Sequence, residues 1–197
     1  MRDAGLMARK EAVIEKVKAT FGAVKEALKS GLDPAGYLAP EGADFTQGQV
    51  SNGDRFQGMP WVYLDFPKYF SHDAIFTFRS FFWWGHGFVF ALMLAGPSLT
   101  QYKANLRRAY DRLADHGLHL SLARDPWEWR QGEGYTIDLT GANRAAVEAA
   151  LPDRPFLKLQ SVLGFESNRD HAGLDEDAVV QAGRRAFIRC GPIITRS

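Results

Sequence analysis

The stretch Ala74–Ala95, AIFTFRSFFWWGHGFVFALMLA, decides the fold. Two apolar runs flank Gly85-His86-Gly87, which is a sequence typical of a hairpin loop. The first run alternates between two faces, whereas the second run, Phe88–Ala95, is apolar on both faces. A strand that is apolar on both faces is covered on both faces. The stretch therefore predicts a β-hairpin inside a sheet that is sandwiched or closed over itself.

The same region is not expected to cross a membrane. Its almost uncharged part, Phe81–Gly96, has 16 residues and is interrupted by glycines. A spanning helix needs about 20 apolar residues. An extension upstream would add Arg79, whose charge is costly in lipid. We therefore predict no membrane partner.

Outward from the hairpin, hydrophobic periodicity and turn residues predict the remaining elements. An apolar stripe predicts a long helix over Met7–Leu28, which Gly31 and Pro34 end. Residues 32–58 are rich in Gly, Asp, Gln, Asn and Ser, and they predict a long loop with room for one short strand. Other predicted strands are Trp61–Phe66, Leu118–Ala123, Tyr135–Leu139 and Phe156–Phe165, and other predicted helices are 98–116, Ala142–Leu151 and Leu174–Arg189.

In two of these strands the sequence also predicts where the strand ends or where it lies in the sheet. Pro67 is expected to close the strand Trp61–Phe66, because proline cannot donate to a sheet. In Phe156–Phe165, leucines alternate with Lys158 and Gln160. That pattern favours a half-buried or edge strand.

The order of elements, αβββαββαβα, predicts an α+β fold, with an antiparallel sheet of about six strands and helices packed against it. The length of 197 residues fits a single domain over 1–197. Within it we expect an N-terminal helix (1–31), a long loop (32–58) and a sheet-and-helix core (59–197).

Charge and cysteine content limit the partners and the compartment. The chain has 24 basic and 23 acidic residues and a net charge of +1, without the basic stripe that a nucleic-acid-binding protein needs. We therefore predict no nucleic-acid partner. The single cysteine, Cys190, allows no intramolecular disulfide, and the N-terminus carries no apolar run typical of a secretory signal. These features predict a cytoplasmic protein.

The sequence lacks the common signatures of zinc, phosphate-loop, serine-hydrolase and dinucleotide sites. His116 and His119 have a spacing found among metal ligands, but Gly117 separates them and no third ligand is recognisable. We therefore predict neither a metal nor another cofactor. Arg184, Arg185 and Arg189 of the last helix are interpreted as a solvated face.

Arg79 is the most informative candidate, because it lies in a strand surrounded by aromatic residues. A guanidinium in that setting must be paired, stacked on a ring or facing a cavity. Asp65, at the end of the preceding strand, is the natural partner. Two interpretations remain open: a buried ion pair that fixes the strand register, or an arginine that binds a carboxylate or phosphate.

Further candidate binding residues are aromatic or lie in loops. Trp83 and Trp84 end the first strand of the hairpin, and His86 lies at its tip, where it is a candidate general base. Trp127 and Trp129 alternate in a polar loop, where they can line a ligand slot, form a protein interface or cover the open end of the core.

One resemblance supports a bacterial origin. Residues 58–70, GMPWVYLDFPKYF, and residues 76–85, FTFRSFFWWG, resemble the motif GxPWVxLDFPKxF…FRxxFWWG of a family of uncharacterised bacterial proteins. The resemblance implies a bacterial cytoplasmic source and implies no activity, substrate or catalytic residue.

The sequence favours a non-enzymatic module that binds a small anionic or aromatic ligand, or that assembles as a homo-oligomer. The binding region would be the aromatic sheet around Arg79 or the loop that holds Trp127 and Trp129. The alternative is a small-molecule enzyme that acts on an anionic substrate, with Arg79 as the anion clamp and Asp65 or His86 as the acid or base.

Overall fold

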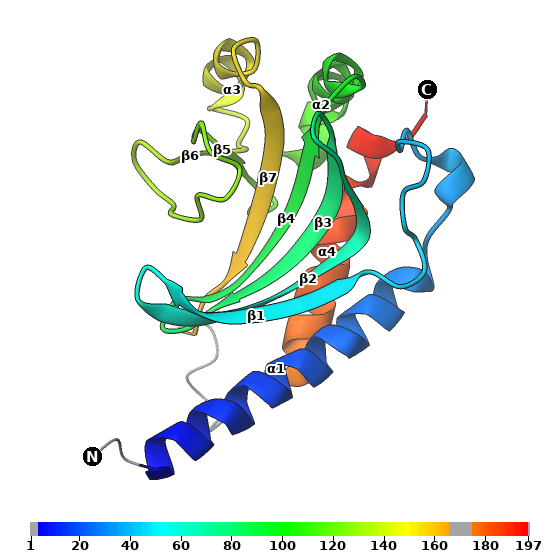
Figure 1. Ribbon diagram of the computed structural model, residues 1–197. Helices are drawn as coiled ribbons and strands as arrows, with labels where there is room; N and C mark the ends of the chain where they lie inside the picture. The colour runs from blue at the N-terminus through cyan, green and yellow to red at the C-terminus, as the bar shows by residue number, and fades with distance from the viewer. Residues whose placement is uncertain (1–3, 166–174, 197) are drawn as a thin grey trace.

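The computed structural model describes residues 4–165 and 175–196, and these residues form a curved antiparallel sheet with helices packed against it (Figure 1). Seven strands are arranged in the order β1-β2-β3-β4-β7-β5-β6. The elements are α1 (Ala4–Lys29), η1 (Pro34–Gly36), β1 (Gln49–Phe56), β2 (Met59–Phe70), β3 (Ile75–Trp83), β4 (Gly87–Ala95), α2 (Leu99–Leu113), β5 (His119–Ser121), β6 (Thr136–Asp138), α3 (Arg144–Ala150), β7 (Phe156–Leu163) and α4 (Glu176–Ile194).

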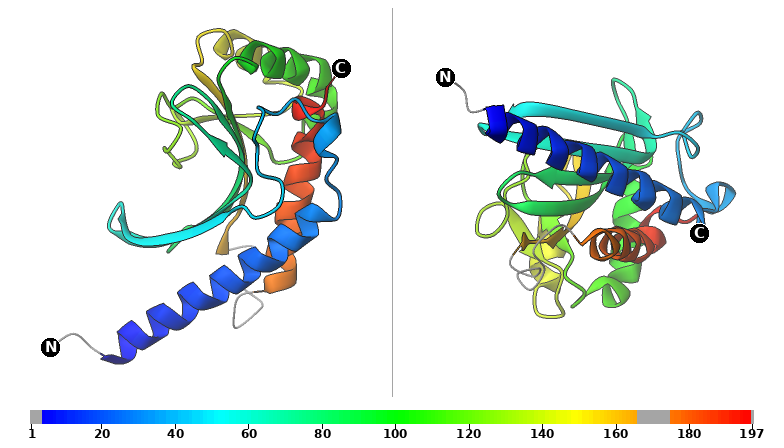
Figure 2. Two further views of the ribbon diagram at one scale, coloured as in Figure 1. Left: turned by 45° about the vertical axis from the view of Figure 1, so that its right-hand side comes forward. Right: turned by 90° about the horizontal axis from the view of Figure 1, so that it is seen from below.

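The two faces of the sheet have different covers. Helices α1, α2 and α4 pack on one face, and their apolar stripes form the main core with alternate residues of the central strands. The opposite, concave face carries a smaller aromatic cluster, and segment 122–135 lies over it (Figure 2). The α+β class and the antiparallel pairing predicted from the sequence are confirmed. In the described ranges, no helix has both the length and the apolar content of a membrane span.

The predicted loop 32–58 contains one strand, β1, for which the sequence left room without showing its position or its length of eight residues. β1 pairs with β2 at the edge of the sheet, and most of its residues are exposed or half-buried. An edge strand of this kind shows no apolar alternation, so the period-2 pattern that reveals strands is missing. Gly53 allows the close pairing, since a Cβ there would lie 2.6 Å from the Trp61 ring.

Pro67 does not end its strand as predicted. β2 continues to Phe70, and its register with β3 shifts between Asp65 and Lys68. A bulge tolerates proline because it leaves a position without a ladder hydrogen bond. The backbone carbonyl of Pro67 accepts a hydrogen bond from the Thr77 hydroxyl at 2.9 Å.

The edge-strand interpretation of Phe156–Phe165 is also wrong. β7 lies between β4 and β5, and the side chains of Lys158 and Gln160 are fully buried. The last helix runs beyond the predicted end at Arg189 and includes Pro192. Its predicted start at Leu174 lies outside the described residues, and Asp175 caps the helix by accepting a hydrogen bond from the Ala178 amide.

Candidate functional site

The concave face holds a row of residues that crosses the sheet and is polar at every position except Ala91, and we call it the polar row. Alternation along each strand sends every second side chain to this face. The antiparallel register then aligns one residue from each of five neighbouring strands: Asp65, Arg79, Ala91, Gln160 and His119. The row therefore joins residues that are far apart in the sequence.

Arg79 and Asp65 form a buried bidentate ion pair. Arg79 Nε and Nη2 donate to Asp65 Oδ1 and Oδ2, and both distances are 2.7 Å. The guanidinium also lies over two rings, with its carbon 3.9 Å from the Tyr63 centroid and 4.7 Å from the Trp127 centroid. The pair and the stacking explain how a charge is accommodated among aromatic residues. An anionic ligand at Arg79 would have to compete with Asp65.

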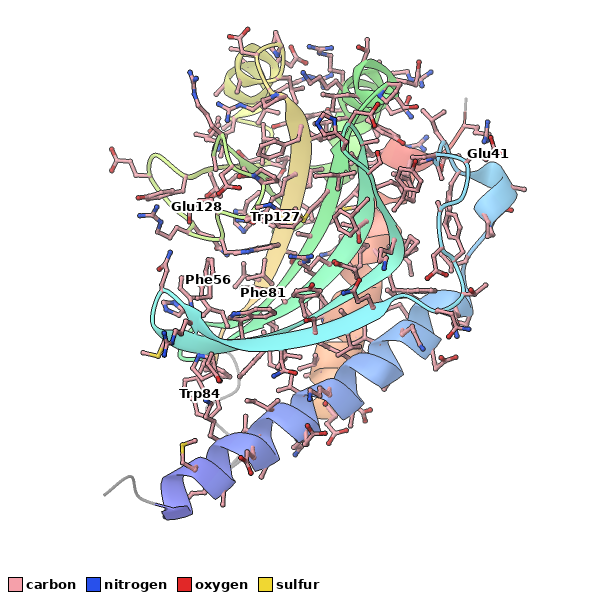
Figure 3. The ribbon with its side chains drawn as sticks, in the orientation of Figure 1. Glu41, Phe56, Phe81, Trp84, Trp127 and Glu128 are labelled. Carbon is pink, nitrogen blue, oxygen red and sulfur yellow. The ribbon has the colours of Figure 1, made fainter. Side chains whose placement is uncertain are left out.

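Segment 122–135 covers the face through Trp127, which is labelled in Figure 3, and through Trp129. Trp129 is buried and stacks on Phe81, with ring centroids 4.6 Å apart. Trp127 is 39% exposed, so one side of this ring faces solvent while the other faces Arg79. The loop thus covers the aromatic face, and the alternatives of a ligand slot and a protein interface stay predictions.

Lys158 fixes this cover to the sheet. Its Nζ donates to the backbone carbonyls of Pro126 at 3.0 Å and Glu128 at 2.6 Å, and it lies 3.5 Å from the centroid of the Trp129 ring. Burial, and to a smaller extent the positive charge of Arg79, lower the pKa of Lys158 to about 7. The sheet and the cover are thus joined through an ammonium group whose charge is costly to bury.

A cavity of about 370 Å³ opens beside the cover, and we call it the concave-face cavity. Its walls are mainly aromatic and aliphatic, and its polar side chains come mainly from the loop. The lining residues are Trp83, His86, Val89, Trp129, Arg130, Gln131, Tyr135 and Val162. The exposed His86 ring stacks on Trp83 with centroids 3.6 Å apart. Arg130 lies over the Tyr135 ring at 4.3 Å.

Charge at the cavity mouth is partly compensated. Arg130 Nε donates to Glu128 Oε1 at 2.9 Å. This hydrogen bond lowers the pKa of the Glu128 carboxyl, against the opposing effect of burial. The mouth therefore carries an ion pair and a histidine, whereas the walls are apolar.

Several buried polar atoms beside the cavity have no hydrogen-bond partner in the described part of the chain. They are the Trp83 indole Nε1 and both amide atoms of Gln160. Buried polar groups are nearly always paired, and an unpaired one costs about 1–3 kcal/mol. Trp83 lines the concave-face cavity, and Gln160 lies two residues from Val162, which also lines it.

His119 ends the polar row with a carboxylate neighbour. Its Nδ1 lies 2.7 Å from Asp138 Oδ1, across the β5–β6 pair. This contact orients the imidazole. His116, whose spacing from His119 in the sequence is found among metal ligands, is exposed after α2. In residues 4–165 and 175–196 no group of three His, Cys, Asp or Glu side chains has the arrangement of a metal site.

The structure brings most of the predicted binding residues to one face. Arg79, Asp65, Trp83, His86, Trp127 and Trp129 all contact the concave side. Trp84 does not, because it follows Trp83 in the chain and points to the helix-covered side, where it packs against Phe82.

Sequence reasoning missed Lys158, Gln160 and the His119–Asp138 pair. The alternation of Lys158 and Gln160 with leucines is a usable signal for a polar face of the strand, but by itself it favours a half-buried or edge strand. We also compared the chain with protein-family models, curated proteins and solved structures, and none matches. The geometry of the site is therefore the basis for the functional inference.

Proposed function

We propose that this protein is a non-enzymatic binding module of the bacterial cytoplasm. Its ligand would be a small planar aromatic molecule with a hydrogen-bond acceptor, held in the concave-face cavity. One observation carries the proposal: Trp83, which lines an aromatic cavity, has a buried indole N–H for which the described residues supply no acceptor. The free, buried Cys190 fits a reducing compartment.

The size and chemistry of the cavity suit such a ligand. Its volume of about 370 Å³ lies in the range of small-molecule sites. Trp83, Trp129 and Tyr135 in the lining favour an aromatic ligand, since aromatic rings also gain energy from edge-to-face contacts. A ligand acceptor would satisfy the Trp83 N–H, and His86 could bind a second polar group at the mouth.

Native mass spectrometry of the full chain tests for a co-purified ligand. A native mass above a multiple of 22.0 kDa, with the excess lost under denaturing conditions, supports the proposal and gives the mass of the ligand. A bare multiple of the chain mass removes this support, and binding must then be shown directly.

Direct binding is tested with quinoline and naphthalene, which have the same shape and differ in one ring nitrogen. We expect calorimetry to show tighter binding of quinoline, and we expect Trp83→Phe to remove that preference because phenylalanine has no N–H. Trp84→Phe is the matched control on the opposite face. Absence of binding by both probes, or an unchanged preference in Trp83→Phe, would contradict the proposal.

A second candidate function is a small-molecule enzyme acting on an anionic substrate. The His119–Asp138 contact favours it, because a carboxylate on Nδ1 leaves Nε2 as a general base. Arg79 would act as the clamp only after release from Asp65. Hydrolysis of p-nitrophenyl phosphate and p-nitrophenyl acetate tests this function, and activity that persists in His119→Asn would exclude His119 as the base.

We also propose that the protein assembles as a homo-oligomer. The N-terminal half of α1 extends beyond the sheet (Figure 2), and Met7 and Val13 there are each 38% exposed. Such apolar side chains on a projecting helix suit packing against a second copy. Sedimentation analysis should give a multiple of 22.0 kDa that falls to the monomer mass in Met7→Glu/Val13→Glu, whereas a wild-type monomer would contradict assembly.

A further inference from the structure

A second cavity, separate from the concave face, lies where the C-terminal end of α1 meets α2 and α4. Its volume is about 640 Å³, and it shares no lining residue with the concave-face cavity. The helices that form it pack on the other face of the sheet (Figure 1). We call it the arginine groove, for the side chains described next.

Four arginines line this groove. Arg108 and Arg112 lie one turn apart on α2, Arg184 lies on α4, and Arg196 follows the end of α4. All four are exposed, and the 15 lining residues include no aspartate or glutamate. Four positive charges therefore converge from three segments without a carboxylate among them.

The groove arginines lack the counter-charges that three other arginines in the described residues have. Arg79, Arg130 and Arg144 each contact at least one carboxylate within 3.0 Å. Within residues 4–165 and 175–196, no ion pair involves any of the four groove arginines. Arg108 donates to the neutral Oδ1 of Asn105. Like charges gathered without partners repel one another, and an anion would relieve that repulsion.

The floor of the groove is apolar. It is formed by side chains of all three helices: Leu28, Ala109, Phe187, Ile188 and Pro192. Ile188 is 56% exposed, the largest exposed fraction among the large apolar side chains described. The backbone leaves room as well, because a Cβ added at Gly31 or Gly191 would meet no atom within 4 Å.

We propose that the arginine groove binds a small amphipathic anion, a molecule with a carboxylate or phosphate group and an apolar body. Guanidinium groups form paired, charge-assisted hydrogen bonds with such oxyanions. The exposed floor offers apolar area to the rest of the molecule, and the volume is that of a small-molecule site. This inference is independent of the proposed function at the concave face.

Three probes separate the contributions to binding. Octyl phosphate below its micelle concentration carries both the anion and the apolar chain, inorganic phosphate carries only the anion, and octyl glucoside carries only the chain. Isothermal titration of the full chain should show 1:1 binding of octyl phosphate that weakens as salt is added. Inorganic phosphate should bind at least about tenfold more weakly, since burying a few methylene groups contributes that much. Octyl glucoside should show no binding.

Substitutions then locate the site. Arg112→Gln and Arg184→Gln should each weaken octyl phosphate binding by about tenfold, the usual effect of losing a charge-assisted hydrogen bond. Arg107→Gln and Arg185→Gln are matched controls, because these exposed neighbours on the same helices do not line the groove. Gly191→Leu keeps every arginine and should abolish binding by filling the open space.

Three results would overturn the proposal. The first is no binding of octyl phosphate at millimolar concentration by a protein whose circular dichroism shows it to be folded. The second is an equal loss in the groove variants and the matched controls, which would indicate non-specific attraction by positive charge. The third is unchanged binding in Gly191→Leu. Trp83→Phe should leave octyl phosphate binding intact, so failure at one site is distinguishable from failure at the other.

Discussion

Arg79 on β3 and Asp65 on β2 are cross-strand neighbours, and their side chains meet through two parallel hydrogen bonds of 2.7 Å each. Their side chains are only 8% and 2% exposed. A pair this buried is sensitive to the loss of one partner, because the other charge is then left in the interior.

Arg79→Met should therefore lower the free energy of unfolding by about 3–5 kcal/mol. The double variant Arg79→Met/Asp65→Asn should recover part of this loss, since it removes the orphaned charge. Urea denaturation at pH 7 measures both effects. Arg144→Met is the control: Arg144 is 42% exposed in its ion pairs, so the expected loss is about 1 kcal/mol or less. Equal losses in the single and double variants would contradict the pair as a unit.

The buried Lys158 should give the stability of the protein an unusual dependence on pH. Its pKa is about 7 in the folded chain, below the ordinary value of 10.5, because burial disfavours the charged form. Between these values the unfolded chain binds more protons, so this contribution to stability rises with pH and is lost as pH falls through 7. Lys158→Met should flatten the rise between pH 7 and pH 9.

Cys190 sets the upper pH limit for this measurement. Burial raises the pKa of the Cys190 thiol to about 12, so its contribution to stability falls as pH rises above the ordinary value of 9. Thermal unfolding from pH 6 to pH 9 therefore avoids the Cys190 contribution. Burial also lowers the pKa of Lys103, so the share of Lys158 is the difference in slope between the wild type and Lys158→Met. Lys18→Met, at a half-buried lysine on α1 that pairs with Glu15, should leave the slope unchanged. A wild-type profile that is flat from pH 7 to pH 9 would contradict a neutralised Lys158.

The sequence predicts the centre of this fold well, because the signals there are local. The hairpin of β3 and β4 follows from alternation and two glycines, and Asp65 is recognisable as the partner of an isolated buried arginine. β1 is hidden because an exposed edge strand needs no apolar alternation. Lys158 is misplaced because its side chain is buried by a loop 30 residues away, which no strand pattern encodes.

The arginine groove illustrates a second limit. Arg184 was interpreted as part of a solvated face, and it is exposed. The groove exists only because α2 and α4 pack side by side with the end of α1. A sequence pattern shows which residues share a helix face, but not which faces of distant helices converge.

Substitution of Trp129 measures how much the cover, segment 122–135, contributes to the stability of the fold. Trp129 is 3% exposed, stacks on Phe81 and lies over the Lys158 ammonium. Trp129→Ala should destabilise the protein by about 3–5 kcal/mol, the usual cost of deleting a buried tryptophan. Trp127→Ala, at the exposed neighbour, should cost about 1–2 kcal/mol through its lost contact with Arg79. Denaturant titration compares them, and similar losses would show that Trp129 does not anchor the cover.

Substitutions at Gly87 and Gly85 test whether the β3–β4 hairpin determines the shape of the concave-face cavity. Both have positive φ values, 117° and 82° respectively, so alanine is strained at either position. They differ in space: a Cβ at Gly87 would lie 2.5 Å from the Leu163 backbone oxygen, whereas one at Gly85 would meet no atom within 4 Å. Gly85→Ala should cost about 1 kcal/mol for the backbone conformation alone.

Gly87→Ala should cost more, about 3 kcal/mol or above, because β4 must move away from β7 to relieve the collision. That movement would separate Val89 from Val162, which face each other on these strands and line the concave-face cavity. Gly87→Ala should therefore also weaken quinoline binding, whereas Gly85→Ala should not. Equal stability and equal binding in the two variants would show that the close approach of β4 to β7 at Gly87 does not shape the cavity.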